Sequence, residues 1–254
     1  MIVDYKIIPL NTGTITLDQG AYCTLGRGVG TKVDTPSTAW CITDGKEHFL
    51  VDTGMCNTER ANKWHHEGFQ PKGGRIDEQL MSRAGIRPEA ISAVFFTHLH
   101  WDHCSNMKLF RNARYYVQAR ELEFALNPTL PPYYRSYEAP ILGIEAPFTG
   151  CSFITVDGDY AYNDAITFFP TPGHSVGHQS VAVRTAKGTV VIAGDAVFVE
   201  ENMEGDPGQL LEFIPIGRYI NYFEMWNSFK EIKRRAALVL PGHDARVFNK
   251  SSYP

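Results

Sequence analysis

Residues 91–103 combine an apolar run with a dense cluster of imidazole and carboxylate side chains. The first six residues, Ile-Ser-Ala-Val-Phe-Phe, predict a buried β-strand. The next seven, Thr-His-Leu-His-Trp-Asp-His, follow with no polar spacer. Imidazoles and a carboxylate at this spacing are typical of metal ligands. The chain must therefore fold so that the end of a buried strand reaches a metal site.

The spacing within this cluster distributes the side chains over two positions. His98 and His100, at i and i+2, leave the end of an extended segment on the same side, so both imidazoles can reach one ion. Asp102 and His103 lie in the following turn, where they can supply a carboxylate and an imidazole to a second metal ion. Two cations held so close together repel each other, and an anion between them is needed to offset that repulsion. We therefore expect a further anionic ligand later in the chain.

Three later segments also end a predicted strand with a candidate ligand. His174 follows the apolar run 166–169, Asp195 follows 190–193, and His243 follows 237–240. Loops at one edge of a sheet can converge on a common site. We assign His98, His100 and His174 to the first metal, Asp102, His103 and His243 to the second, and Asp195 as the bridging carboxylate.

The other histidines lack this context. We interpret His178, four residues after His174, as a structural group or a support for a ligand. We interpret His48, His65 and His66 as surface residues. Another strand runs into Val-Asp-Thr-Gly at 51–54, where Asp52 could orient a ligating imidazole from behind.

The rest of the chain alternates short apolar runs, turn residues and helical patterns. We expect strands at 5–10, 38–42, 48–52, 91–96, 113–117, 153–156, 166–169, 180–183, 190–193 and 237–240, and helices at 75–84, 120–126 and 222–235. The Pro- and Tyr-rich segment 127–147 predicts an insertion without regular structure. The glycines at 26–30 predict a flexible loop, since no helix follows as in a phosphate-binding loop. No composition shift marks a linker, so we predict a single domain over residues 1–254.

Composition and charge exclude several classes of protein. The chain is 43% hydrophobic and 20% charged, as in ordinary globular proteins. A net charge of -4 and scattered basic residues argue against a nucleic-acid partner. The first ten residues include Asp4 and Lys6, and no long apolar run follows, so we expect no signal peptide, no membrane span and a cytoplasmic location. The five cysteines are widely spaced and predict free, mostly buried thiols.

With these residues the sequence resembles the metallo-β-lactamase superfamily. The match covers nearly the whole chain, from Val51-Asp-Thr-Gly54 through residues 98–103 to His174, Asp195 and His243. The resemblance implies an α/β (α+β) fold, an αβ/βα sandwich of two packed mixed β-sheets with helices on the outer faces and metals at one edge. It also implies two divalent metal ions per chain. Zinc is the predicted metal, although nitrogen and oxygen ligands also suit manganese, iron or cobalt.

Finer matches favour the N-acyl homoserine lactonase branch. They are Leu50 to Met55, Gly85 to Phe96, Tyr116-Val-Gln118 and Thr171 to Ser180. The commonest dizinc β-lactamases carry Cys in place of Asp195, and flavodiiron oxidoreductases carry Glu in place of the second His of the motif. Thioesterases of the glyoxalase II type share the ligand set. The lactonases commonly place a Tyr three residues after the bridging Asp, whereas Phe198 stands here and cannot donate a hydrogen bond to a substrate carbonyl.

The resemblance implies a dinuclear metal-dependent lactone hydrolase that opens the ring of N-acyl homoserine lactones, a quorum-quenching activity. A hydroxide bridging the ions would attack the carbonyl, and Asp102 could pass the proton to the leaving alkoxide. Trp101 and Phe198 would offer substrate an apolar wall, and segments 127–147 and 17–29 could line an acyl channel. The alternatives are another lactone (γ-butyrolactone or ring-fused), a glyoxalase II-like thioester or a cyclic amide. We expect a small-molecule lactone as the substrate, no nucleic-acid or membrane partner, and a monomer or homodimer.

Overall fold

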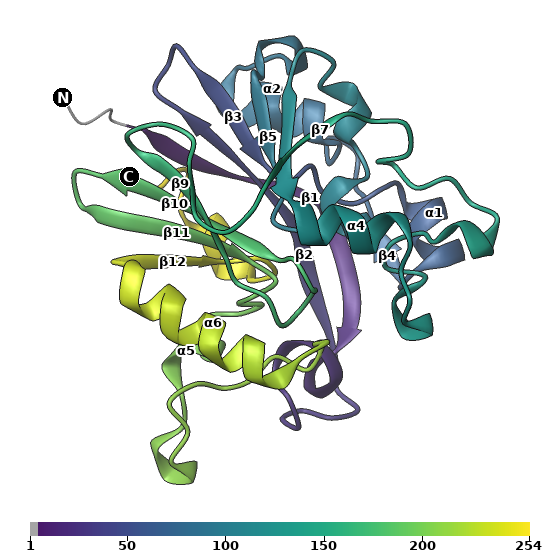
Figure 1. Ribbon diagram of the computed structural model, residues 1–254, viewed down its shortest axis with the longest axis vertical. Coiled ribbons are helices and arrows are strands. Elements are labelled where there is room, and N and C mark those ends of the chain that lie inside the picture. Colours follow the sequence, from purple (N-terminus) through teal and green to yellow (C-terminus); the bar gives the residue numbers. More distant parts are fainter. Residues whose placement is uncertain (1–4) are drawn as a thin grey trace.

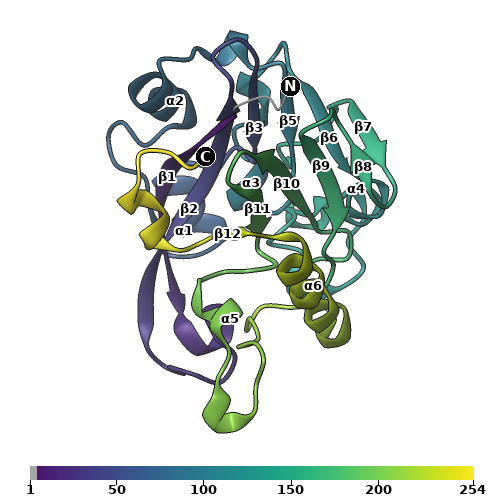
Figure 2. The same ribbon diagram turned by 90° about the vertical axis from the view of Figure 1, so that its left-hand side faces the viewer.

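The computed structural model describes residues 5–254, so Asp4, used above in the argument on the N-terminal segment, lies outside the described residues. Two mixed β-sheets pack against each other, with helices on the outer faces (Figures 1 and 2). The predicted sandwich of two mixed sheets is confirmed.

The first sheet has the strand order β4-β1-β2-β3-β5-β6-β7. Its strands are β1 (Lys6–Asp18), β2 (Lys32–Thr43), β3 (His48–Val51), β4 (Gly68–Phe69), β5 (Ala93–Phe95), β6 (Arg114–Gln118) and β7 (Phe153–Val156). The second sheet has the order β12-β11-β10-β9-β8. Its strands are β8 (Tyr160–Ala161), β9 (Ile166–Pro170), β10 (Gln179–Thr185), β11 (Gly188–Gly194) and β12 (Leu238–Pro241). The helices are α1 (Thr58–Trp64), α2 (Ile76–Ala84), α3 (Trp101–Cys104), α4 (Ala119–Leu126), α5 (Glu201–Glu204) and α6 (Tyr222–Arg235).

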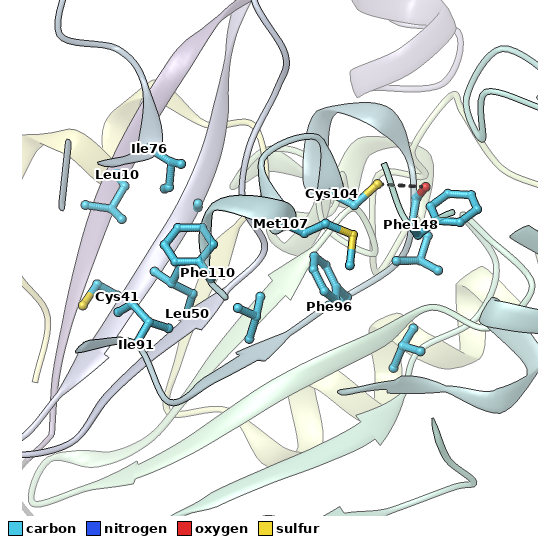
Figure 3. Packing of buried hydrophobic residues seen from close by; sticks show 14 of the residues in the cluster. Leu10, Cys41, Leu50, Ile76, Ile91, Phe96, Cys104, Met107, Phe110 and Phe148 are labelled. Carbon is cyan, nitrogen blue, oxygen red and sulfur yellow. Dashed lines mark hydrogen bonds between the residues drawn. The ribbon is translucent and has the colours of Figure 1, made fainter. Parts of the chain in front are cut away.

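The central strands bury both of their faces. In β3, Phe49 packs between the two sheets, and its neighbour Leu50 faces the outer helices, because successive side chains of a strand point to opposite faces. Figure 3 shows the outer cluster, in which Leu50 and Phe96 lie with Ile76 of α2. Strands covered on both sides have continuous apolar sequences, which is why the run before His98 reads as one unbroken stretch.

Capping residues mark where the helices begin and end. Gly85 adopts φ 69°, a left-handed conformation that suits glycine, and its N–H bonds back to the carbonyls of Leu80 and Met81. Asn221 accepts hydrogen bonds from the first turn of α6. The basic residues 233–235 lie in the last turn of that helix, where the helix dipole favours them.

Every predicted strand and helix is present, but the structure differs in detail. β1 and β2 are much longer than predicted and extend beyond the other strands as a two-stranded ribbon (Figure 2). The expectation of no regular structure in segment 127–147 is wrong, since 3-10 helices form at Pro131–Tyr133 and Pro140–Leu142. Each begins with proline, whose fixed φ suits the first helical turn.

Two predictions on composition can be compared with the fold. The cysteines form no disulfide, and four of the five are buried. Within residues 5–254, the structure contains no helix with the length and apolar character needed to cross a membrane.

Candidate metal centre

The predicted ligands gather at one edge of the two sheets because several strands end there. β3 and β5 run parallel, and so do β11 and β12, so their carboxyl ends lie at common edges. His98 and His100 follow β5, Asp195 follows β11 and His243 follows β12. Asp102 and His103 lie on the short helix α3, and His174 lies in the loop between β9 and β10. The structure brings all of them together, and all are buried except Asp102, which is partly exposed.

The Asp195 carboxylate lies between two groups of imidazoles. Its Oδ1 atom is 3.0 Å from Nε2 of His103 and 3.0 Å from Nε2 of His243. Its Oδ2 atom is 3.3 Å from Nε2 of His174 and 4.0 Å from Nε2 of His98. Each carboxylate oxygen therefore faces one group, which is the arrangement that a bridging ligand requires.

The remaining ligand atoms complete the two groups. Nδ1 of His100 lies 3.0 Å from Nε2 of His174. Oδ2 of Asp102 lies 3.7 Å from Nε2 of both His103 and His243. Potential ligand atoms lie within 4.8 Å of one another in three sets: His98, His100 and His174; His98, His103 and Asp195; and Asp102, His103 and His243. The first and third sets coincide with the two positions predicted from the sequence.

Unpartnered polar atoms indicate that this cluster fits metal ions. Nε2 of His98 and Nε2 of His100 are buried and have no hydrogen-bond partner among the described residues. A buried polar atom without a partner costs about 1–3 kcal/mol. Coordination of a cation by these lone pairs would remove that cost, and a set of imidazoles and carboxylates suits zinc or another divalent transition metal.

Hydrogen bonds behind the imidazoles fix their orientation. Nδ1–H of His103 donates to Oδ2 of Asp52 over 2.9 Å, as predicted for an orienting carboxylate. The Nδ1 atoms of His174 and His243 lie 2.8 Å from the backbone carbonyls of Arg218 and Pro36. With Nδ1 occupied, Nε2 of each of these three rings is the atom available to a metal.

Asp52 itself sits in a strained backbone conformation. Its φ is 60°, which non-glycine residues rarely adopt. The backbone N–H and the hydroxyl of Thr97 both donate to its carboxylate at 2.8 Å. The hydroxyl of Thr97 also lies 3.0 Å from Nδ1 of His98, so Asp52 and Thr97 together hold ligands of both groups.

His178 lies behind the site and is absent from the three ligand sets. Its Nε2 atom accepts the backbone N–H of Asp195 at 3.1 Å, and its Nδ1 atom lies 2.9 Å from the hydroxyl of Thr171. Both ring nitrogens are therefore used within the protein, in agreement with a supporting role.

Glu121 is a functional candidate that sequence reasoning missed. Its buried carboxylate accepts the backbone N–H of Leu99 at 3.0 Å and the Tyr137 hydroxyl at 2.8 Å. It also accepts the hydroxyl of Ser175 at 2.7 Å and the N–H of Gly177 at 3.0 Å. Glu121 thus joins the loop that carries His98 and His100 to the loop that carries His174. A glutamate on the buried face of α4, four residues before Ala125, is the sequence signal that could have revealed it.

The interpretation of His48, His65 and His66 as surface residues is wrong for His65. The side chain of His65 is only 1% exposed, and its Nε2 atom lies 2.9 Å from Oε1 of Glu138. Its ring stacks on Trp101 with centroids 4.2 Å apart. The other two are partly buried, and His66 lines the cavity described next. His65 directly follows α1, and its burial depends on Glu138, which belongs to the distant segment 127–147.

A small cavity opens onto the ligands. Trp101 and Phe198 line it, as predicted for an apolar wall. The ring of Phe198 lies 4.7 Å from the ring of His243 and 5.6 Å from that of His174. The acyl channel predicted from segments 17–29 and 127–147 is reduced to a few contacts, since these segments contribute only Leu17, Tyr22 and Ser136 to the cavity lining. Arg218 also lines the cavity and was not predicted from the sequence.

Burial and the carboxylates set the protonation of the imidazoles. Burial lowers the pKa of His98 and His100 well below the ordinary value, and lowers that of His174 to about 4. Burial also opposes ionisation of His103 and His243, but neighbouring carboxylates, Asp195 foremost, outweigh it and raise the pKa of both. Metal binding must displace protons from these two rings, because only a neutral imidazole is a ligand.

Comparison with known proteins gives the family. The profile of the Metallo-beta-lactamase superfamily matches residues 33–246. An N-acyl homoserine lactonase of Bacillus cereus is 27% identical over 242 residues, covering 87% of this chain and 89% of the relative. The N-acyl homoserine lactonase AttM of Azorhizobium caulinodans is 27% identical over 235 residues, covering 87% of this chain and 86% of the relative. The predicted resemblance to this branch is confirmed.

Solved structures share the fold. A mutant of B. thuringiensis AiiA with N-decanoyl-L-homoserine bound at the active site superposes with a TM-score of 0.78 at 24% identity, covering 98% of this chain and 96% of that one. An N-acyl homoserine lactone hydrolase with N-hexanoyl-L-homoserine bound at its catalytic metal center gives a TM-score of 0.78 at 22% identity, with the same coverage. Because the profile spans most of the sequence and every predicted ligand, the chain belongs to the metallo-β-lactamase superfamily.

Proposed function

We propose that this chain is a dinuclear metal-dependent lactone hydrolase that opens the ring of N-acyl homoserine lactones, and that residues 1–254 act as one hydrolase domain. The observation that carries the proposal is the Asp195 carboxylate, whose two oxygens each face one imidazole group beside a cavity. The similarity to N-acyl homoserine lactonases over most of the chain supports the substrate class.

We assign two divalent ions to the centre and zinc as the native metal. His98, His100 and His174 would hold one ion, Asp102, His103 and His243 the other, and Asp195 would bridge them. When bound, such a pair of ions supplies an activated water as nucleophile and a Lewis acid for the carbonyl. Asp52 would keep the His103 ring in place through its 2.9 Å hydrogen bond.

The protein's own side chains would position the substrate and move the proton. Asp102 lines the cavity with its side chain 13% exposed, where it would accept the proton that the attacking water loses and pass it to the leaving ring oxygen. Trp101, held by its stack on His65, and Phe198 would enclose the lactone ring and exclude water from it.

Phe198 favours a second candidate, a simple γ-butyrolactone or a ring-fused lactone. No hydroxyl at this position contacts the substrate carbonyl, so the carbonyl must be oriented by packing. A small rigid ring needs less orientation by hydrogen bonds than a flexible acyl amide. A glyoxalase II-like thioester and a cyclic amide are further alternatives on the same ligand set.

A substrate panel tests the proposal. Metal-loaded and chelator-treated protein would be assayed with N-acyl homoserine lactones of several chain lengths, γ-butyrolactone, a glutathione thioester and a cyclic amide. We expect metal-dependent opening of N-acyl homoserine lactones with kcat/KM above about 10⁴ M⁻¹s⁻¹. Hydrolysis of the thioester or amide alone would replace the lactonase assignment, and metal-independent turnover would exclude the proposed centre.

A further inference from the structure

Arg218 is a partly buried cation with no carboxylate partner among residues 5–254. Three other arginines are buried to a similar degree, and each forms an ion pair: Arg27 with Asp206, Arg60 with Glu138, and Arg235 with Glu231 and Asp159. Burying a charge is costly unless it is paired. Arg218, which lines the cavity, is the exception among these arginines because it has no carboxylate partner. This suggests that its partner comes from outside the chain.

The Arg218 guanidinium is held in place beside the ligands. It lies 4.0 Å from the centre of the Tyr133 ring, and that ring stacks on His100 with centroids 6.2 Å apart. Its Nη2 atom donates to the carbonyl of Pro132 at 2.9 Å and to the hydroxyl of Ser136 at 3.3 Å. Its Nε and Nη1 groups have no acceptor among the described residues. A guanidinium with free donors and a fixed plane is suited to bind a carboxylate.

The surroundings strengthen this interpretation. A fixed positive charge next to a cluster that fits metal ions is repelled by them, unless an anion lies between. The carboxylates that line the cavity, Asp102 and Asp195, already face imidazoles. Phe198 offers only an apolar surface to this cavity, and the side chains of Tyr22 and Trp101 offer uncharged donors, whereas Arg218 brings a permanent positive charge with unused N–H groups.

We propose that Arg218 determines specificity by binding a carboxylate carried by the substrate, so that the native substrate is a lactone with an anionic substituent. This inference rests on the proposed lactonase function. The carboxylate can be attached to the lactone ring or to the end of an acyl chain. In either case the ring would pack against Phe198 while the carboxylate pairs with the guanidinium of Arg218.

Matched pairs of lactones test the inference in the metal-loaded protein. One pair is γ-butyrolactone-γ-carboxylate and its methyl ester, and the other is N-succinyl homoserine lactone and its methyl ester. The measured quantity is the ratio of kcat/KM for the carboxylate to that for the ester. We expect a ratio of at least about ten in one of the pairs, and that pair shows where the carboxylate stands.

Three variants separate recognition from a structural role. Arg218→Gln should lower the ratio at least about tenfold, mainly through KM, and Arg218→Lys should restore part of it. Arg27→Gln, a partly buried arginine outside the cavity, should leave the ratio unchanged. A wild-type ratio near one in both pairs, or equal losses on carboxylate and ester in Arg218→Gln, would overturn the inference.

A binding measurement keeps this test apart from the lactonase proposal. Tetrahydrofuran-2-carboxylate has no bond to hydrolyse, and calorimetry can compare it with tetrahydrofurfuryl alcohol, an uncharged analogue that also has none. We expect the carboxylate to bind wild type at least about tenfold more tightly than Arg218→Gln. Equal binding to both proteins would contradict the inference. If binding behaves as expected but no lactone is hydrolysed, the lactonase function fails and the carboxylate site stands.

Discussion

The ligand cluster and the cavity wall beside it are built in different ways. The cluster consists of side chains that follow strands or lie on short connecting segments, and several are fixed from behind, as His103 is by Asp52. The wall is assembled from distant loops: Arg218 donates a hydrogen bond to Ser136, and the ring of Tyr22 lies against that of His66. Substitutions in the cluster should therefore abolish the reaction, whereas substitutions in the wall should change the relative kcat/KM values for different substrates.

The largest effect is expected for Asp195→Ala. This change removes the anion that allows two cations to lie close together, so metal content should fall and kcat/KM should drop by at least about a thousandfold. His178→Ala removes the acceptor of the Asp195 N–H and the partner of the Thr171 hydroxyl but no predicted metal ligand, so its effect should be much milder. Metal analysis and kinetics of the two variants provide the comparison, and equal losses in both would contradict the ligand assignment.

An intermediate effect is expected for Glu121→Ala. The change leaves the buried donors of Leu99, Tyr137, Ser175 and Gly177 without their acceptor. Unfolding free energy should fall by about 3 kcal/mol, and metal affinity by about tenfold to a hundredfold. Denaturant unfolding and metal titration measure the two quantities.

The matched control for this prediction is Glu123→Ala, since Glu123 is exposed on the same helix. It should change neither stability nor affinity noticeably. If Glu121→Ala behaved like this control, the carboxylate would not be the link between the two ligand loops.

The smallest effect is expected for Phe198→Tyr. A neutral hydrogen bond contributes about 0.5–1.5 kcal/mol, so kcat/KM for N-acyl homoserine lactones should change by about tenfold or less. Steady-state kinetics over several chain lengths measures it. A wild type that is inert on all of these lactones, together with a gain of several orders of magnitude in the variant, would mean that the native substrate is another lactone.

The same contrast explains what could be predicted from the sequence. The grouping of these side chains was predictable because each follows an apolar strand or lies in one short motif, so local pattern and position in the sheet coincide. The fold was predictable for the same reason, since strands buried on both faces have unmistakable apolar runs. The ribbon of β1 and β2 was not, because its outer part contains Thr, Asp and Gly residues that resemble a loop.

The wall depends on contacts between segments far apart in the chain. Arg218 is an ordinary loop arginine until segment 127–147 folds over it and supplies Tyr133 and Ser136. His65 follows a short helix that was not predicted, and only Glu138 and Trp101 explain why it is buried. Single-sequence patterns carry no information on such pairings. The cluster could therefore be predicted from the sequence, together with Trp101 and Phe198 of the cavity wall, whereas His66 and Arg218 could not.

The most direct test of the dinuclear centre is a metal titration followed by activity. Chelator-treated protein would receive zinc in fractions of an equivalent, with elemental analysis of bound metal and the rate of lactone opening measured at each step. We expect activity to be lost on chelation, to return as zinc is added and to reach its plateau at two bound ions per chain. Full activity at one ion per chain, or activity that survives chelation, would contradict the dinuclear centre.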